Sequence, residues 1–339
     1  MQGRSSLATT GYILEEIDQI PEVLRQASAR HLTASTEIAK KFAGRPPRLI
    51  ATIGRGSSDH ASTFLRYAFE LTLGIPGVSI APSIASVYGR QLQLDDALCI
   101  VISQSGRSPD IRQAAAMARR GGATVIAIVN DEHSPLAEEA EFVIPIGVGP
   151  EKAVAATKSF IGSAVAGLRL LATLARDDRL NAELDALPNL FSQPTDLPDI
   201  ETVLRARTAL IIGRGPALGI AQEAALKLKE IIQFPAEAFS SAEILHGPWQ
   251  LADTDCALIA WASNVASQAS QHGIVTAFRA LGRPVLELSS DEAQAHLRHD
   301  LVKPLAPLPN FYRALAIAAQ RRGLDPDSPS LLNKITETT

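Results

Sequence analysis

The chain has 339 residues, of which 46% are hydrophobic and 20% charged, a composition typical of a globular protein with a buried core. Its net charge of −4 argues against a nucleic-acid surface, which usually carries an excess of Lys and Arg. The opening residues show no signal-peptide pattern, and no uncharged apolar run reaches about 18 residues. We therefore expect a cytoplasmic protein that binds neither nucleic acid nor a membrane.

Helical spacing dominates the N-terminal segment, residues 1–47. Apolar residues recur every three to four positions and predict a helix within residues 11–42. A proline in the interior usually ends or kinks a helix, so we expect Pro21 to break this one. Two further prolines then close the segment.

A strand, a glycine turn and a helix follow in succession. The strand is predicted over residues 48–53, the turn reads Gly54-Arg55-Gly56-Ser57-Ser58, and the helix begins near Asp59. The turn lacks the third glycine of a dinucleotide fingerprint and the lysine of a P-loop. On its own it is as compatible with a capped tight turn as with a ligand site.

A loop rich in hydroxyl groups follows the next predicted strand, residues 97–102, and precedes a predicted helix over residues 111–119. Ligands of open parallel sheets bind at the carboxyl ends of strands, and a helix N-terminus there favours phosphate. Capping of the helix by Ser108 or Asp110 is the alternative, but a cap needs only one such residue. The loop therefore predicts a phosphomonoester site made by Ser103, Gln104, Ser105 and Ser108, with Ser57 and Ser58 at the same sheet edge.

The second half of the chain repeats the first. Gly213 of a second strand–glycine turn–helix unit follows Gly54 by 159 residues, and two more strand pairs are offset by 160 residues. Such a constant offset indicates an internal duplication. Continuous apolar strands that alternate with helices predict an α/β fold, with two tandem doubly wound parallel-sheet domains. We expect the first domain at residues 48–185 and the second at 200–324.

Prolines mark the two segments outside these domains. Pro188, Pro194 and Pro198 predict a linker over residues 186–199. The last segment, residues 325–339, is predicted to be a tail that packs on the second half.

A helix predicted over residues 219–232 carries an apolar stripe and, on the opposite face, Glu223, Lys227 and Glu230. The spacing favours a solvated face with a Glu–Lys pair. A paired Glu and Lys is also what proton transfer beside a carbonyl needs. His246, which precedes Gly247-Pro248, is compatible with a surface residue or with a general acid/base.

No residue pattern predicts a metal or another cofactor. Cys99 and Cys256 form neither a disulfide framework nor a zinc-binding spacing, and we expect both to be buried, reduced thiols. The histidines other than His246 also show no ligand spacing.

Taken together, these residues resemble the sugar isomerase (SIS) domain family, with its tandem flavodoxin-like domains. The resemblance is strongest to the isomerase half of glucosamine-fructose-6-phosphate aminotransferase and to SIS-type glucosamine-6-phosphate deaminases. It covers nearly the whole chain, in order. The matching motifs are Gly54–Ser58, Ser103–Ser108, Glu151–Lys158, Glu223–Glu230, Glu243–Pro248 and Asn333-Lys334.

The resemblance implies a role for each matching residue. Glu230 would move a proton between C1 and C2 of an open-chain sugar, and Lys227 would steady the oxygen or nitrogen at these carbons. His246, in this family sometimes supplied by a neighbouring subunit, would open the ring, and Lys334 would contact the carbonyl or form a Schiff base with it. A homodimer and a small sugar phosphate as ligand are implied, with no cofactor. The phosphate pocket would contain Ser57, Ser58, Ser103, Gln104, Ser105, Ser108 and Val154.

The chain also departs from the aminotransferase pattern. Ala156 stands where the synthase has serine, and Asn333 where it has alanine. The glutamine-hydrolysing domain of the synthase begins with a cysteine, whereas this chain begins Met1-Gln2-Gly3 and is too short for that domain. We therefore expect a glucosamine-6-phosphate deaminase that releases ammonia. The alternatives are an aldose-ketose isomerase, a galactosamine-6-phosphate deaminase, a fructosamine-phosphate deglycase and, more remotely, a sugar-phosphate sensor without activity.

Overall fold

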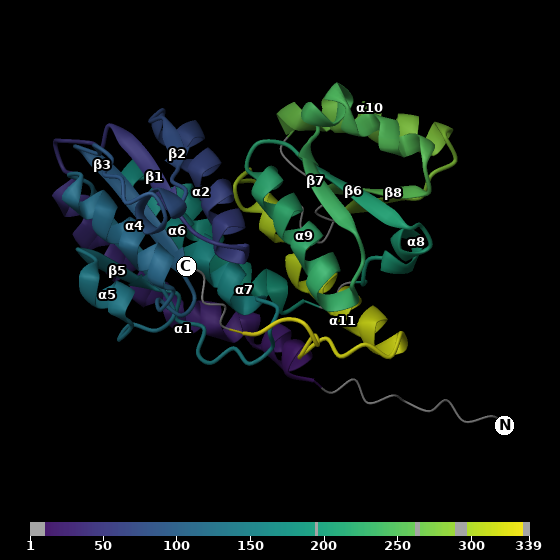
Figure 1. The fold of residues 1–339 in the computed structure, drawn as a ribbon, viewed down its shortest axis with the longest axis horizontal. Helices are drawn as coiled ribbons and strands as arrows, with labels where there is room; N and C mark the ends of the chain where they lie inside the picture. Colours follow the sequence, from purple (N-terminus) through teal and green to yellow (C-terminus); the bar gives the residue numbers. More distant parts are fainter. Residues whose placement is uncertain (1–10, 194–195, 262–264, 289–296, 335–339) are drawn as a thin grey trace.

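The computed structural model describes residues 11–193, 196–261, 265–288 and 297–334. Two α/β halves stand side by side, each a parallel sheet flanked by helices (Figure 1). The first sheet has the strand order β2-β1-β3-β4-β5 and the second β7-β6-β8-β9. The order 2-1-3-4-5 is the flavodoxin-like doubly wound order, and the four described strands of the second sheet follow its first four positions. The predicted fold class and internal duplication are confirmed.

Every strand pair in both sheets is parallel. The central strand of the first sheet, β3, is buried along its whole length, because neighbouring strands and helices cover both its edges and both its faces. The strands are β1 (Leu49–Ile53), β2 (Gly77–Ser79), β3 (Ala97–Ser103), β4 (Thr124–Val129), β5 (Phe142–Pro145), β6 (Thr208–Gly213), β7 (Ala236–Ser240), β8 (Cys256–Trp261) and β9 (Val285–Leu288). Cys99 and Cys256, in β3 and β8, are buried and free, as predicted.

The helices connect the strands and cover the sheets. They are α1 (Tyr12–Lys41), α2 (Ser57–Leu73), α3 (Ser83–Ser86), α4 (Pro109–Arg120), α5 (Pro135–Glu139), α6 (Lys158–Ala175), α7 (Asp178–Phe191), α8 (Ile200–Leu204), α9 (Ala217–Ile232), α10 (Val265–Ala280) and α11 (Leu308–Arg321). Short 3₁₀ helices are η1 (Glu243–His246), η2 (Pro248–Asp253) and η4 (Lys303–Leu305).

One hydrophobic core runs through both halves. It joins the inner faces of the two sheets to α1, α2, α6, α9 and α11, while a smaller apolar cluster fills the outer face of each sheet. α6 lies at its centre, and every residue from Lys158 to Ala172 is buried. By length and composition α6 could cross a membrane, but 83% of that window is buried inside the protein, as in a core helix.

Two sequence predictions are wrong in this region. α1 continues through Pro21, because burial of its apolar face against α6, α7 and α11 outweighs the lost backbone hydrogen bond. The predicted linker over residues 186–199 is helical in its first part, since α7 includes Pro188 and ends at Phe191. Leu184 and Leu187 on α7 are buried, which explains why this segment stays packed on the first half.

Candidate active site

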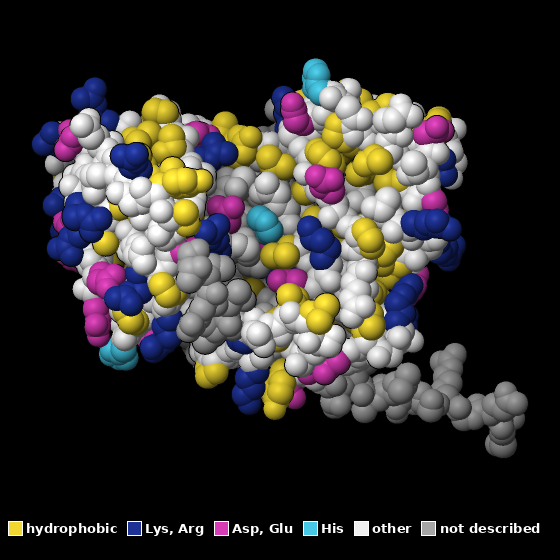
Figure 2. Space-filling view, viewed as in Figure 1, with side chains coloured by type: hydrophobic (Ala, Val, Ile, Leu, Met, Phe, Trp, Pro, Cys, Tyr) yellow, Lys and Arg dark blue, Asp and Glu magenta, His cyan; other side chains and the backbone are white. Residues whose placement is uncertain are grey.

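A cavity of about 310 Å³ opens at the carboxyl ends of β1 and β3, where the end of α9 and the C-terminal tail meet them. The chain passes outward to β2 after β1 and then returns to β3, so the cavity lies at the switch point where doubly wound sheets bind ligands. Figure 2 shows charged and histidine side chains gathered in the hollow between the halves. The cavity is lined by Arg55, Gly56, Ser57, Ser58, Ile102, Ser103, Gln104, Ser105, Ser108, Ile111, Glu151, Val154, Ala156, Glu230, Leu332, Asn333 and Lys334.

The loop after β3 has a backbone shape that requires glycine at Gly106. This residue has φ +63°, and a Cβ there would lie 2.1 Å from Ser134 Oγ. Its N–H donates to Ser103 Oγ at 3.1 Å, which folds the loop back onto the strand end. The loop then enters the N-terminus of α4, which favours an anion. Ser108 stands at the N-cap but makes no capping hydrogen bond, so capping does not account for it.

Arg55 lines the cavity, although the sequence predicted no role for it. Its Nε donates to Asp110 Oδ2 at 3.0 Å, and its Nη2 lies 2.9 Å from the same oxygen in an ion pair. The Asp110 side chain is fully buried at the start of α4, so this pair ties the turn after β1 to the loop after β3. About half of the Arg55 side chain stays exposed, which leaves a fixed guanidinium beside the Ser103–Ser108 loop. The sequence signal that could have identified Arg55 as a site residue was its position within the turn Gly54–Ser58.

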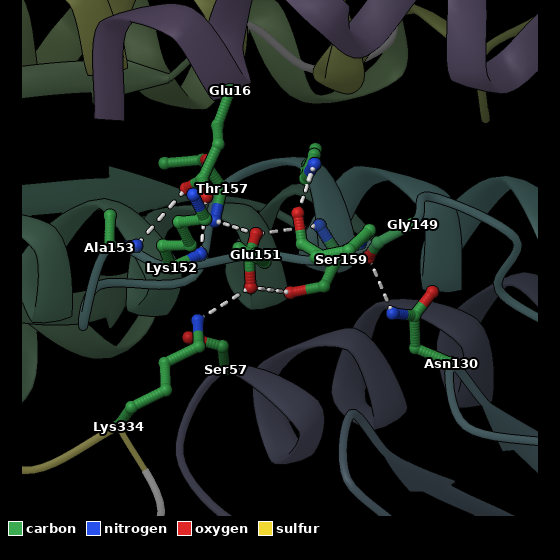
Figure 3. A network of polar contacts seen from close by, with 12 residues as sticks. Glu16, Ser57, Asn130, Gly149, Glu151, Lys152, Ala153, Thr157, Ser159 and Lys334 are labelled. Atoms are coloured by element: carbon green, nitrogen blue, oxygen red, sulfur yellow. Dashed lines mark hydrogen bonds and ion pairs between the residues drawn. The ribbon is translucent and has the colours of Figure 1, made fainter. Parts of the chain in front are cut away.

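Glu151 is a buried carboxylate that holds the tail lysine at the cavity (Figure 3). Its Oε2 accepts from Lys334 Nζ at 2.8 Å and from Ser159 Oγ at 2.6 Å. Its Oε1 accepts from the backbone N–H groups of Thr157 and Ser159, both at 3.0 Å. Burial alone would raise the pKa of Glu151, but the Lys334 ammonium and the Ser159 hydrogen bonds outweigh it and lower this pKa. Glu151 is therefore anionic at neutral pH.

Glu223, Lys227 and Glu230 form a connected row of charges on α9. Lys227 Nζ lies 3.3 Å from Glu223 Oε1 and donates to Glu230 Oε2. Burial alone would lower the pKa of Lys227, but the two carboxylates outweigh it and raise this pKa. The side chains of Glu223 and Lys227 are fully buried, whereas that of Glu230 is 20% exposed and reaches the cavity. The solvated face predicted from the spacing is therefore wrong, because α2 of the first half packs over it.

The predicted site residues line this one cavity, with two exceptions. Lys227 lies behind the lining and contacts it through Glu230. His246 ends η1, is exposed, and lies outside the cavity lining of this chain. Ala156 and Asn333, where the chain departs from the synthase pattern, are both in the lining.

Asp327 holds the C-terminal tail to the first half, toward which the tail crosses after α11 (Figure 1). Its carboxylate accepts from Tyr12 N at 2.8 Å and from Ile13 N at 2.7 Å, the first N–H groups of α1. Such N–H groups have no partner within their own helix and favour a negative charge. The Asp327 carbonyl also accepts from Val154 N at 2.9 Å, at the cavity wall. One residue thus fixes the tail to the first half, seven positions before Lys334. The prediction that this tail packs on the second half is therefore wrong, because its polar partners belong to α1 and to the cavity wall of the first half.

Asp327→Ala is expected to lower kcat about tenfold, because the loss of two charge-assisted hydrogen bonds loosens the tail that carries Lys334. Protease cleavage after residue 324 should become faster in the same variant. Asp253→Asn, at an exposed aspartate of η2, is the matched control and should change neither quantity. An Asp327→Ala variant with wild-type kcat and wild-type cleavage would show that the tail is held without this anchor.

The sequence model of the SIS domain family matches residues 45–172 of this chain. A crystal structure from Silicibacter pomeroyi, of a protein provisionally named a phosphosugar isomerase, is 39% identical to the chain. Its TM-score is 0.87, and the alignment covers 94% of this chain and 100% of the other. The chain belongs to the SIS domain family. The resemblance seen in the motifs is thereby confirmed.

Two further proteins are similar to the chain. The glutamine–fructose-6-phosphate aminotransferase (isomerizing) of Symbiobacterium thermophilum is 31% identical over 359 residues, which cover 95% of this chain and 58% of the relative. The glucosamine-6-phosphate deaminase of Thermotoga maritima shares the fold, with a TM-score of 0.73 at 22% identity and coverage of 97% and 100% of the two chains. The chain spans less than two thirds of the length of the curated aminotransferases that it matches first.

Proposed function

We propose that this protein is a glucosamine-6-phosphate deaminase, which converts glucosamine 6-phosphate and water to fructose 6-phosphate and ammonia. The observation that carries the proposal is the lining of the cavity. The Ser103–Ser108 loop, the carboxylate of Glu230 and the amine of Lys334 all face one volume of about 310 Å³. A phosphate grip, a base and an amine are what this reaction needs from the protein.

The proposed reaction begins with the open-chain sugar, its phosphate at the Ser103–Ser108 loop and its C1 aldehyde near Lys334. Glu230 takes the proton from C2, which gives an enolamine, and a proton is returned to C1. The product is an imine at C2, and water adds to it and releases ammonia as the C2 ketone forms. Lys227 serves in this proposal by holding the Glu230 carboxylate from behind, since the two are hydrogen bonded.

An amino sugar fits the charges of the cavity. Two carboxylates, Glu151 and Glu230, line it together with two cations, Arg55 and Lys334. A substrate with a phosphate at one end and an ammonium at C2 has one negative and one positive group, which complement the cations and the carboxylates of the cavity. The phosphate would lie toward Arg55, which is fixed beside the phosphate loop, and the ammonium toward the carboxylates.

Aldose-ketose isomerisation of a sugar phosphate is the second candidate, and the 39% identity to the Silicibacter pomeroyi protein favours it. It uses the same proton transfer without hydrolysis. Incubation of the purified protein with glucosamine 6-phosphate, galactosamine 6-phosphate, fructosamine 6-phosphate and fructose 6-phosphate separates the candidates. We expect ammonia from glucosamine 6-phosphate. Aldose formation from fructose 6-phosphate without any ammonia release would favour the isomerase instead, and ammonia from galactosamine 6-phosphate alone would favour the other deaminase.

We further propose a cytoplasmic homodimer in which His246 serves the cavity of the partner subunit. The support is that His246 is exposed and lies outside the cavity lining of its own chain. Glu230→Gln and His246→Asn should each be nearly inactive. When the two variants are dissociated and reassociated together, about a quarter of all sites regain both residues in a symmetric dimer. No recovery of activity on mixing would contradict the exchange of His246 between subunits.

A further inference from the structure

Two side chains of the first half reach the charged row on α9. His60 Nδ1 lies 3.0 Å from Glu223 Oε2, and Ser57 Oγ donates to Glu223 Oε1 at 3.1 Å. Both side chains belong to the first turn of α2. The two helices approach closely here, because a Cβ on Gly219 of α9 would lie 2.6 Å from the His60 carbonyl oxygen. The contact is therefore built into the packing of one half against the other.

Glu223 depends on these donors because its side chain is fully buried. A carboxylate removed from water is unstable unless its oxygens are hydrogen bonded or paired. Lys227 cannot supply all the hydrogen bonds that the Glu223 carboxylate needs, since the same ammonium also donates to Glu230. Burial alone would raise the pKa of Glu223, but Lys227 and then His60 outweigh it and lower this pKa.

The geometry also fixes which ring nitrogen of His60 acts. A carboxylate only accepts hydrogen bonds, so Nδ1 must carry a proton whether the ring is neutral or charged. His60 is outside the cavity lining, and Glu223 is outside it too. Any effect of His60 on the sugar must therefore pass through Glu223, and from there either through Lys227 to Glu230 or through Ser57 in the cavity lining.

We propose that His60 is a positioning residue, which through Glu223 sets how the Lys227 ammonium is shared between Glu223 and Glu230. The proposal rests on the proposed function, in which Glu230 moves the C2 proton. With the His60 N–H on Glu223, Lys227 keeps its close contact with Glu230. Without that N–H, Glu223 draws the ammonium toward itself, and Glu230 loses the partner that orients it. The half that binds phosphate thus completes the proton-transfer group of the other half.

The test compares three substitutions of His60 by the exchange of the substrate C2 proton with solvent deuterium. His60→Ala should lower kcat about 10- to 100-fold, the value of one hydrogen bond to a charged group, with KM nearly unchanged. His60→Asn should recover most of this loss, because its amide nitrogen can occupy the position of Nδ1. His60→Gln should not, because its amide reaches further, toward the position of Nε2. His133→Ala, at an exposed histidine, is the matched control and should behave as wild type.

Each outcome separates this proposal from the proposed function. Exchange that is equally fast in the wild type and in His60→Ala overturns the role of His60 and leaves the proposed function standing. A raised KM at unchanged kcat also overturns it, because His60 would then serve binding. Equal recovery of kcat in His60→Asn and His60→Gln also overturns the role of His60. So does a His60→Asn variant that recovers no kcat although it melts at the wild-type temperature. A wild type that exchanges the C2 proton of no sugar phosphate overturns both proposals together.

Discussion

Replacement of Glu230 by Gln is expected to slow exchange of the C2 proton about 100- to 10,000-fold, the usual contribution of a positioned general base. Gln keeps the size of the side chain and an oxygen that can accept from Lys227, but it cannot take a proton. Binding should persist, because the Ser103–Ser108 loop is on another half of the molecule. The measurements are ammonia release from glucosamine 6-phosphate, proton exchange by NMR, and the Kd for fructose 6-phosphate.

The neighbouring β7 offers a control for the charge change. Glu237→Gln removes one negative charge at an exposed position outside the cavity lining and should leave all three quantities unchanged. Exchange at the wild-type rate in Glu230→Gln would mean that another group takes the C2 proton. A large loss of binding in the same variant would mean that Glu230 holds the sugar rather than its proton.

The row of charges on α9 shows how far the sequence could be interpreted. Periodicity placed Glu223, Lys227 and Glu230 on one face of a helix and the apolar residues on the other, and this is how α9 is built. It could not tell what covers the polar face. The covering residues, Ser57 and His60, are more than 160 positions away in sequence, and only the packing of the two halves brings them there. A spacing pattern has no information about such a contact.

Other features also divide into those set by neighbouring residues in the sequence and those set by tertiary packing. The duplication and the loop after β3 follow from local sequence, because strands, glycine turns and helix starts are set by neighbouring residues. Pro21 does not end α1, since the burial of that helix is a tertiary effect. The close approach of Lys334 to Glu151 depends on the tail crossing to the first half, and the sequence offered only the motifs on which the resemblance rests.

Replacement of Lys227 by Met is expected to lower the free energy of unfolding by about 3–5 kcal/mol at pH 7. The substitution removes the ammonium between two carboxylates and leaves Glu223 charged and fully buried, with hydrogen bonds from the neutral hydroxyl of Ser57 and from His60. Urea unfolding measures the change. Lys229→Met, at an exposed lysine two positions along the same helix, should stay within about 0.5 kcal/mol of wild type.

A second variant distinguishes the unpaired charge from lost packing. Glu223→Gln combined with Lys227→Met leaves no buried charge unpaired on this pair and should recover much of the lost stability. If the double variant is no more stable than Lys227→Met alone, the loss comes from the shape of the side chain and not from the charge of Glu223.

The dependence on pH gives a further check with a definite sign. In the wild type burial would raise the folded-state pKa of Glu223, but Lys227 and then His60 outweigh it and hold this pKa below the usual value for a glutamate. Its contribution to stability is therefore present above that value and disappears as the pH falls through the folded-state pKa. In Lys227→Met the strongest opposing partner is gone, burial dominates, and the folded-state pKa should rise above the unfolded one. The variant then loses stability as the pH rises, so its deficit against wild type should be smallest in acid and grow toward pH 7. A deficit that stays constant from about pH 4 to pH 7 would show that Glu223 does not carry the effect.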